Sequence, residues 1–298
     1  MNELLINNSF KIGSIEIRYY AICIVSGFFA CALFSIPLFK KRGFKPDILL
    51  DLLIAVIPCS IICARLWYVL FDLDEYIVDG VFRFDLAIAI WNGGQAIHGG
   101  VVGGALGLFI VAKIKKVPFS RFGDIGAALL PLGQAVGRLG NFFNQEVYGA
   151  VVPADKAWFP YATFIEADGQ WHIALCFHEM FFNFLAFAAI YIFLFNYTGK
   201  RNGYAISFYF IYYGLVRACM EPMREQEYNM GNGFLGMPTM FWLSLVVFAG
   251  GIALLTVLLV KDVKEKNYWW KDMFKRKKPA EQSAQADAGE KSSADEEK

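Results

Sequence analysis

The sequence predicts an all-α integral membrane protein with about seven spanning helices, the N-terminus outside and the C-terminus in the cytoplasm. Three observations support this fold class: composition, the spacing of apolar stretches, and the placement of positive charge. Of the 298 residues, 57% are hydrophobic, and the mean hydropathy is +0.42. Ordinary soluble domains are about 45–50% apolar even with glycine counted. Aromatic residues make up 17% of the chain, and tyrosine and tryptophan collect at membrane–water interfaces.

Seven predominantly apolar stretches follow one another along the chain. A helix needs about 20 such residues to cross the hydrocarbon core. The third and fourth stretches are short and rich in glycine, and a broken segment of this kind is tolerated where it lines a cavity walled by protein. We therefore expect the functional site near these two. The predicted spans are Tyr19–Phe39, Ile48–Phe71, Ile97–Val111, Phe122–Leu139, Leu175–Phe195, Tyr204–Met220 and Met237–Val260.

Positive charge follows the first, third, fifth and seventh stretches, so it falls in alternate loops. Loops rich in lysine and arginine stay in the cytoplasm, which sets the predicted orientation. The opposite loops carry acidic residues and a longer segment of about residues 147–171. The basic residues are Lys40, Lys41, Arg42, Lys45, Lys113, Lys115, Lys116, Arg121, Lys200, Arg201, Lys261, Lys264 and Lys266.

These patterns divide the chain into three parts. Residues 1–18 are too polar to span and are expected to form an arm on the outer surface. Residues 19–262 are expected to form the seven-helix transmembrane domain, with the segment 147–171 outside the membrane. Residues 263–298 are expected to be a mostly disordered cytoplasmic tail, because their composition cannot bury a core.

The remaining composition excludes several classes of protein. A net charge of +1 offers no broad basic surface for nucleic acid, and the absence of an internal repeat argues against a transporter built from duplicated halves. The cysteines have apolar flanks, and no pair of them has nearby histidines that could complete a metal site, so we interpret them as small packing residues. They are Cys23, Cys31, Cys59, Cys63, Cys176 and Cys219.

The densest group of polar residues lies in Gly137–Gly149, at the outer end of the fourth stretch. Ionisable groups within spanning helices are costly and usually functional. A guanidinium there can hold a phosphate through two parallel hydrogen bonds, and helical spacing puts Arg138, Asn141 and Gln145 on one face. The alternative is a capped helix end whose arginine snorkels to lipid headgroups. The polar residues of the segment are Arg138, Asn141, Asn144, Gln145 and Glu146.

A second group begins at His98, which is followed by a glycine-rich stretch. Gly100, Gly103, Gly104 and Gly107 predict a small-residue face that lets helices pack closely in lipid. His98 lies near the outer surface, where an imidazole can act as a general base near neutral pH. The alternative is a histidine that is simply hydrogen-bonded in the structure.

A third group follows one face of the sixth stretch and consists of Tyr213, Arg217, Glu221 and Arg224. Arg217 and Glu221 have the spacing of an ion pair, and Pro222 is expected to end or kink the helix. The pair is either purely structural or part of a cationic pocket at the same depth as the first group. Arg18, Tyr19 and Tyr20 begin the first stretch on the same outer side, and Arg65 lies within the second.

With these groups assembled, the chain resembles the bacterial prolipoprotein diacylglyceryl transferases. The signature G-R-x-G-N-F-x-N-x-E-x-x-G of that family is matched by Gly137–Gly149. The pattern H-G-G is matched by 98–100, and Y-G-L-x-R-x-x-x-E-x-x-R by 213–224. The opening R-x-Y-A/G pattern is matched by 18–21. The resemblance covers most of residues 10–262.

One segment departs from the family pattern. The family usually opens its fifth helix with H-P-T-x-L-Y-E, whereas this chain has neither the proline nor the tyrosine there, and His178 stands in the place of the tyrosine. Glu179 alone carries over.

The resemblance implies transfer of the diacylglyceryl group of phosphatidylglycerol to the lipobox cysteine thiol of a prolipoprotein signal peptide, with release of glycerol phosphate. It implies neither cofactor nor metal. It also implies a multi-pass protein of the bacterial inner membrane whose active site faces the outer leaflet. The catalytic residues it implies are His98 as base, Tyr20 assisting, and Arg138 and Arg217 on the phosphate. The implied binding residues are Arg138, Asn141, Asn144, Glu146, Gly149, Tyr213, Glu221 and Arg224.

Two other classes of function use the same residues. A transporter or channel for an anionic solute or lipid would move its cargo without forming a covalent product. A non-catalytic lipid-binding assembly factor would keep its lipid after His98 is changed to glutamine.

Overall fold

The computed structural model describes residues 8–13, 15–45, 47–78, 80–90, 93–224 and 234–271. Most of the predicted cytoplasmic tail and part of the predicted N-terminal arm lie outside the described residues. So does the stretch that directly follows Arg224.

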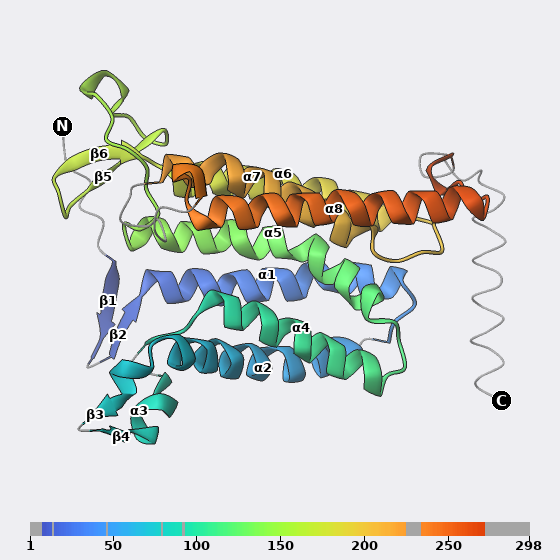
Figure 1. The fold of residues 1–298 in the computed structure, drawn as a ribbon, viewed down its shortest axis with the longest axis horizontal. Coiled ribbons are helices and arrows are strands. Elements are labelled where there is room, and N and C mark those ends of the chain that lie inside the picture. The colour runs from blue at the N-terminus through green and yellow to red at the C-terminus, as the bar shows by residue number, and fades with distance from the viewer. Residues whose placement is uncertain are drawn as a thin grey trace.

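Seven long helices and one short helix make up most of the fold (Figure 1). Each predicted span coincides with one long helix. Five of these helices, α1, α2, α4, α6 and α8, are long and apolar enough to cross a membrane. The other two fall short because α7 has only 17 residues and α5 carries Arg121, Asp124 and Arg138. The helices are α1 (Tyr19–Lys41), α2 (Asp47–Phe71), α3 (Phe84–Ile88), α4 (Ile97–Ile114), α5 (Phe119–Phe143), α6 (Leu175–Asn196), α7 (Tyr204–Met220) and α8 (Thr239–Lys264).

Helix α5 lies at the centre of the bundle, with α1, α2 and α4 on one side and α6, α7 and α8 on the other (Figure 1). The most extensive helix pairs are α2 with α4, α7 with α8, and α5 with both α1 and α6. Helix α5 therefore contacts both halves of the protein. This central position is why the polar end of α5 can gather side chains from its neighbours.

Glycines set the close approach of α4 to α2. A Cβ atom added at Gly99, Gly103 or Gly107 would lie 2.3 Å, 2.2 Å or 2.7 Å from backbone atoms of α2. The predicted packing role of the glycines is confirmed, but the predicted face was partly wrong. Gly100 and Gly104 lie beside the contact, because residues four apart, not three, meet the neighbouring helix here.

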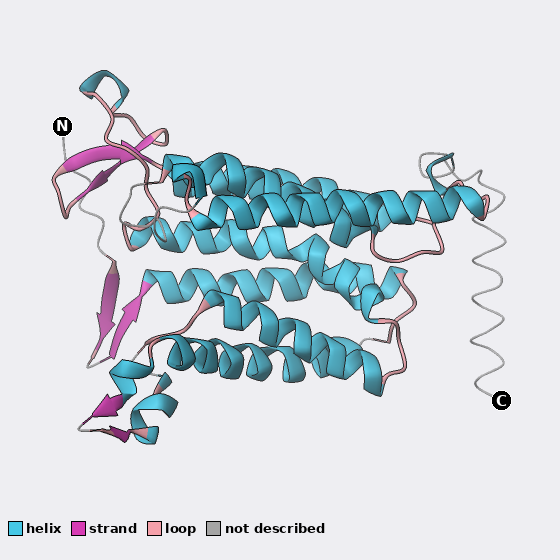
Figure 2. Ribbon diagram, in the orientation of Figure 1, coloured by secondary structure: helices cyan, strands magenta, loops and turns pink. Residues whose placement is uncertain are grey.

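Three short hairpins lie at one end of the bundle, which we call the hairpin end (Figure 2). They correct the all-α prediction: the fold is mostly helical, but the first hairpin leads into α1, and the other two lie where the chain turns back between long helices. The first belongs to the predicted outer arm. The strands are β1 (Ser9–Ile12) with β2 (Ile15–Arg18), β3 (Ile77–Val78) with β4 (Val81–Phe82), and β5 (Ala162–Ile165) with β6 (Gln170–Ile173), all antiparallel.

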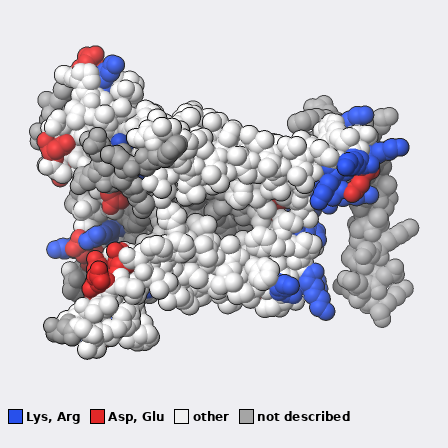
Figure 3. Space-filling model, in the orientation of Figure 1, with Lys and Arg blue, Asp and Glu red and all other residues white. Residues whose placement is uncertain are grey.

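Between the hairpin end and the opposite end, the side shown in Figure 3 is almost free of charged side chains. Large apolar side chains are exposed along the spanning helices, among them Phe29 (73%) of α1, Ile54 (65%) of α2 and Val246 (68%) of α8. Such a band would be unfavourable in water and is expected where lipid chains form the solvent. Together with the five candidate spans, it identifies an integral membrane protein.

Buried carboxylates hold the other end of the bundle together. Asp262, which is fully buried, accepts hydrogen bonds from Arg201 and Tyr204, each at 2.6 Å. Asp124 accepts from the backbone N–H of Gly203 at 2.8 Å, at the start of α7. These side chains satisfy helix ends and each other, so their role is structural.

Candidate functional site

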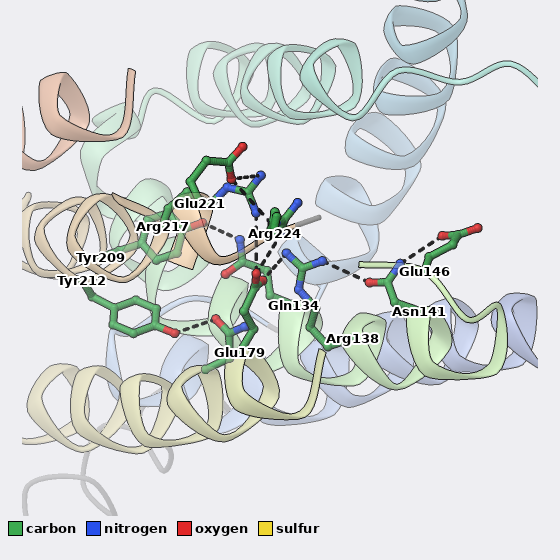
Figure 4. A network of polar contacts seen from close by, with 11 residues as sticks. Gln134, Arg138, Asn141, Glu146, Glu179, Tyr209, Tyr212, Arg217, Glu221 and Arg224 are labelled. Carbon is green, nitrogen blue, oxygen red and sulfur yellow. Dashed lines mark hydrogen bonds and ion pairs between the residues drawn. The ribbon is translucent and has the colours of Figure 1, made fainter. Parts of the chain in front are cut away.

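A network of charged side chains lies where the hairpin ends of α5, α6 and α7 meet (Figure 4). Helix α5 provides Arg138, α6 provides Glu179 and α7 provides Arg217. Glu221 follows in a short 3-10 helix (Glu221–Met223), and Arg224 comes directly after it. Five charges thus converge from segments that are distant in sequence.

Glu179 is the centre of the network. Its carboxylate is only 6% exposed, and it faces three guanidinium groups. Arg138 forms an ion pair with Oε2, while Arg224 donates to Oε1 at 2.7 Å and Arg217 lies 3.6 Å from the same oxygen. A buried carboxylate with three cationic neighbours stays ionised, because each guanidinium favours its charged form.

Glu221 links the two later arginines and is itself 1% exposed. Its Oε2 lies 2.8 Å from Nη2 of Arg217 and 3.6 Å from Nε of Arg224. The predicted pair between Arg217 and Glu221 is therefore present at the predicted spacing. Helix α7 ends at Met220, and Pro222 is the second residue of the 3-10 turn that follows it. This turn directs Arg224 back toward Glu179.

The outer rim of the site is formed at the end of α5. Arg138 donates to Asn141 at 3.1 Å, Asn141 donates to Glu146 at 3.3 Å, and Asn144 donates to the same carboxylate at 3.2 Å. The predicted shared face was wrong for Gln145. The helix ends at Phe143, and Gln145 has a φ of 52°, so it leaves the helix and accepts from the backbone N–H of Glu166.

A small polar pocket opens beside Arg138 and Arg217. On its wall, Gln134 donates to the hydroxyl of Tyr209 at 2.9 Å, and Tyr212 donates to Asn183 at 2.8 Å. The side-chain oxygen of Gln134 is buried without a hydrogen-bond partner. The pocket is lined by Gln134, Arg138, Glu179, Asn183, Tyr212, Tyr213, Val216 and Arg217.

Two glycines of the predicted signature allow close approaches at the site. A Cβ at Gly140 would lie 2.7 Å from the ring of Tyr20, so this glycine admits Tyr20 of α1. Tyr20 is near enough to Glu146 and Arg138 to interact with them electrostatically. A Cβ at Gly149 would lie 2.7 Å from the carbonyl oxygen of Met223. Gly149 therefore allows the chain after α5 to pass beside Arg224.

His98 lies apart from this network. It is exposed at the start of α4, and its ring centroid is 6.3 Å from that of Trp67 on α2. The prediction that His98 belongs to one cluster with the three arginines is thus not supported by the described contacts. The physical reason is that α4 packs mainly on α2 and has only a small contact with α5.

Arg65, which lies within α2, has a structural role. It is 7% exposed, and its guanidinium donates to four carbonyl oxygens of the segment that joins α2 to α4. These belong to Ala87 (2.8 Å), Gly93 (2.6 Å), Gly94 (2.8 Å) and Leu86 (2.7 Å). Arg65 therefore fastens this external loop to the bundle.

We expect Arg65→Met to lower the free energy of unfolding by about 3 kcal/mol, because hydrogen bonds to charged donors contribute about 1.5–3 kcal/mol each and are not additive. The measurement is thermal unfolding in detergent, together with proteolysis between residues 72 and 94. Arg83→Met is the control, since Arg83 is exposed and pairs only with Asp85. Equal melting temperatures for the two variants would contradict the role of Arg65.

Several residues of the site were not predicted as functional. Glu179 was recognised only as a match to a divergent motif, although it is central. Its signal was present in the sequence, because polar residues recur every four positions on each helix of the site. The repeats are Gln134 and Arg138 on α5, Glu179 and Asn183 on α6, and Tyr209, Tyr213 and Arg217 on α7.

The described residues contain no group of three or more His, Cys, Asp or Glu side chains arranged to hold a metal ion. What the site offers is cationic: guanidinium donors held at fixed positions, amides on the rim, and a pocket lined by tyrosines. Groups of this kind recognise the oxygens of a phosphate.

The chain is similar in sequence to known proteins of one family. A family model described as prolipoprotein diacylglyceryl transferase matches residues 7–257. Phosphatidylglycerol–prolipoprotein diacylglyceryl transferase of Streptococcus pneumoniae strain Hungary19A-6 is 36% identical over 263 residues, which cover 87% of this chain and 95% of that protein. The protein of the same name from strain JJA is 35% identical over the same length.

Proposed function

The chain belongs to the prolipoprotein diacylglyceryl transferase family, and we propose that the network around Glu179 is the place where it transfers the diacylglyceryl group. The chain is thus a transferase. We propose further that its acceptor is the lipobox cysteine of a prolipoprotein signal peptide and that the phosphate of phosphatidylglycerol binds among Arg138, Arg217 and Arg224.

The charge of the network supports this assignment. Three arginines and two buried glutamates, Glu179 and Glu221, leave a net charge of 3 − 2 = +1. The phosphodiester of phosphatidylglycerol carries one negative charge, so binding makes the site neutral. A buried charge is costly unless it is paired, and the headgroup supplies the missing partner.

The reaction places further charge on the same phosphate. The thiolate is the nucleophile, so the thiol first gives its proton to a base. A sulfur–carbon bond then forms at the glyceryl carbon while the carbon–oxygen bond to phosphate breaks, and the electron pair stays on the leaving oxygen. Because the phosphate gains a negative charge in this step, preorganised guanidinium donors stabilise the transition state. Arg138 and Arg217 line the pocket and serve in this way.

The remaining residues of the site have supporting parts. Asn141, Asn144 and Glu146 orient the glycerol end of the headgroup at the rim. Glu221 holds Arg217, and Tyr213 forms part of the pocket wall. The aromatic contact between Tyr213 and Tyr209, with ring centroids 5.8 Å apart, keeps that wall in place.

We place the protein in the bacterial inner membrane with seven spans, the hairpin end outside and the active site toward the outer leaflet. The distribution of charge supports this orientation. Lysine and arginine side chains gather at the end opposite the hairpins (Figure 3), as expected of a cytoplasmic surface.

The observation that carries the proposal is the convergence of three arginines on one buried carboxylate at the end of a membrane helix. The test is mass spectrometry of a lipobox peptide incubated with the purified protein and phosphatidylglycerol. A mass increase equal to one diacylglyceryl group on the cysteine is expected. A transporter of anionic solutes or lipids would instead move its cargo across sealed vesicles and leave the peptide unmodified, and that outcome would refute the proposal.

His98 is proposed as the base that removes the thiol proton, with the prolipoprotein cysteine approaching from the side of α4. We expect His98→Gln to lower kcat by about 100-fold, since general base catalysis typically contributes 10²–10⁴-fold. The pH dependence of kcat should also lose its limb near neutral pH. An unchanged pH–rate profile in this variant would remove His98 as the base and leave the arginine site unaffected.

A further inference from the structure

One buried histidine of the segment between α5 and α6 contacts the backbone beside the arginine site. His172 lies on β6 and is 2% exposed. Its Nδ1 is 2.7 Å from the carbonyl oxygen of Gly149, and its Nε2 is 2.7 Å from Oδ2 of Asp168. The ring also packs edge-on against Tyr148, with centroids 4.6 Å apart. Among the described residues, Asp168 and Tyr148 are the titratable groups that face it.

Both partners of the ring are acceptors, and this fixes the state of the ring. A carbonyl oxygen can only accept, so Nδ1 must carry a hydrogen. Burial works in the opposite direction, but the hydrogen bond from His172 keeps the pKa of Asp168 below its usual value. Asp168 is therefore an acceptor at neutral pH as well, and both contacts are made together only by the imidazolium, which has two donors.

The Gly149 carbonyl leads from His172 to the arginine site. Gly149 pairs with Ile173 of the hairpin through its N–H, at 2.9 Å, and with Arg224 through an isolated antiparallel bridge. The Gly149 backbone thus lies between the hairpin and Arg224, and it passes so close to the carbonyl oxygen of Met223 that an added Cβ would lie 2.7 Å from it. Arg224 in turn donates to Glu179 at 2.7 Å.

We propose that His172 is a positioning residue that holds Arg224 in the active site through the backbone of Gly149, and that it does so as the imidazolium. The inference rests on the proposed part of Arg224 in the transfer reaction. His172 does not touch the reacting groups. It fixes the backbone at Gly149, with which Arg224 forms the antiparallel bridge.

When the His172 imidazolium loses one proton, one of its two hydrogen bonds must break, and the partner that is released can be predicted. A hydrogen bond to an ionised carboxylate is roughly twice as strong as one to a neutral carbonyl. The neutral ring therefore keeps its remaining hydrogen toward Asp168 and releases the carbonyl of Gly149. Activity that depends on His172 should accordingly decline as pH rises and the imidazolium is lost.

The first test is a double-mutant cycle with His172→Gln, Arg224→Ala and the double variant, using the lipobox peptide and phosphatidylglycerol. At pH 6 we expect His172→Gln to lower kcat/KM about ten-fold in the wild-type background and to have no effect in the Arg224→Ala background, since coupled residues are not additive. Arg224→Ala without effect would contradict the proposed function. A loss with Arg224→Ala but none with His172→Gln, or equal losses in both backgrounds, would overturn only the inference.

The second test uses the ratio of wild-type to His172→Gln activity from pH 6 to pH 8.5. This ratio cancels every ionisation that the two proteins share, including that of the substrate thiol. It is expected to fall toward one as pH rises, whereas a ratio that does not change with pH would show that His172 acts by packing alone and would overturn the proposal.

Asp168→Asn keeps the ring and does not depend on whether His172→Gln folds. Without the carboxylate the imidazolium loses its charged partner, so the decline of activity should begin at lower pH than in the wild type. Asp155→Asn is the matched control, because it removes an exposed acidic residue of the same external segment and should leave the profile unchanged. Identical profiles for Asp168→Asn and Asp155→Asn would overturn the proposal.

Discussion

Replacement of Arg138 with alanine is expected to abolish detectable transfer, with a loss in kcat of at least about 100- to 1,000-fold. This is the range measured when one preorganised donor is removed from a developing oxyanion. Arg138 contributes more than a donor, because its removal also changes the net charge of the site from +1 to zero. The phosphate then meets a site whose charges are already balanced, and binding of phosphatidylglycerol should weaken as well.

Two further variants separate charge from geometry. Arg138→Lys keeps the charge but loses the planar fork that holds two oxygens at once, so its activity should be low but measurable. Arg83→Ala removes an exposed arginine at the same end of the bundle, paired with Asp85 at 2.7 Å, and should be as active as the wild type. Full activity of Arg138→Ala in detergent with phosphatidylglycerol would rule out its proposed role.

The helical part of the fold could be predicted from the sequence because hydropathy acts over whole helices. Each predicted span coincides with a long helix of the structure. The hairpins were beyond this reasoning. A segment such as Ile15–Arg18 is four residues long, far shorter than the stretch of about 20 residues over which hydropathy identifies a spanning helix.

The site was predictable in part for a different reason. Arg138, Arg217 and Arg224 stood out because charge in a membrane helix is costly, and the structure unites all three. The same rule did not separate them from Arg65, whose four hydrogen bonds go to loop carbonyls. The free-energy cost of burying a charge marks an arginine as significant. Only its partners in the three-dimensional structure show whether it belongs to a ligand site or makes a structural bond.

Glu179 shows most clearly what a single sequence leaves open. Its neighbours in the chain are apolar or divergent from the family pattern, so it looked minor. In three dimensions it is the one carboxylate that touches all three arginines. Without it, three guanidinium groups would lie in a largely buried space with Glu221 as their only acidic partner in the described network. Glu179 thus fixes the positions of the three arginine side chains in the lipid-free protein.

Replacement of Glu179 with glutamine is therefore expected to lower kcat at least about ten-fold without raising KM for phosphatidylglycerol. The site charge rises from +1 to +2, so the anionic headgroup is attracted at least as strongly as before. The arginines, however, lose the common partner that aligns them. The stronger attraction stabilises the bound phosphatidylglycerol but not the transition state, and an interaction of that kind lowers KM without raising kcat. Breaking a buried pair by removing one partner also costs about 3–5 kcal/mol of stability.

Asp262→Asn provides the matched control for Glu179→Gln. Asp262 is also a fully buried carboxylate paired with an arginine, Arg201, but it lies at the opposite end of the bundle. Both variants should melt at lower temperature than the wild type. Only Glu179→Gln should lose turnover per folded molecule. Added phosphatidylglycerol should raise the melting temperature of both variants, because a ligand that binds the folded state selectively stabilises it, and the gain should be at least as large for Glu179→Gln. If both variants kept the wild-type kcat, Glu179 would be a structural anchor like Asp262, and the alignment of the arginines would have to come from the phosphate itself.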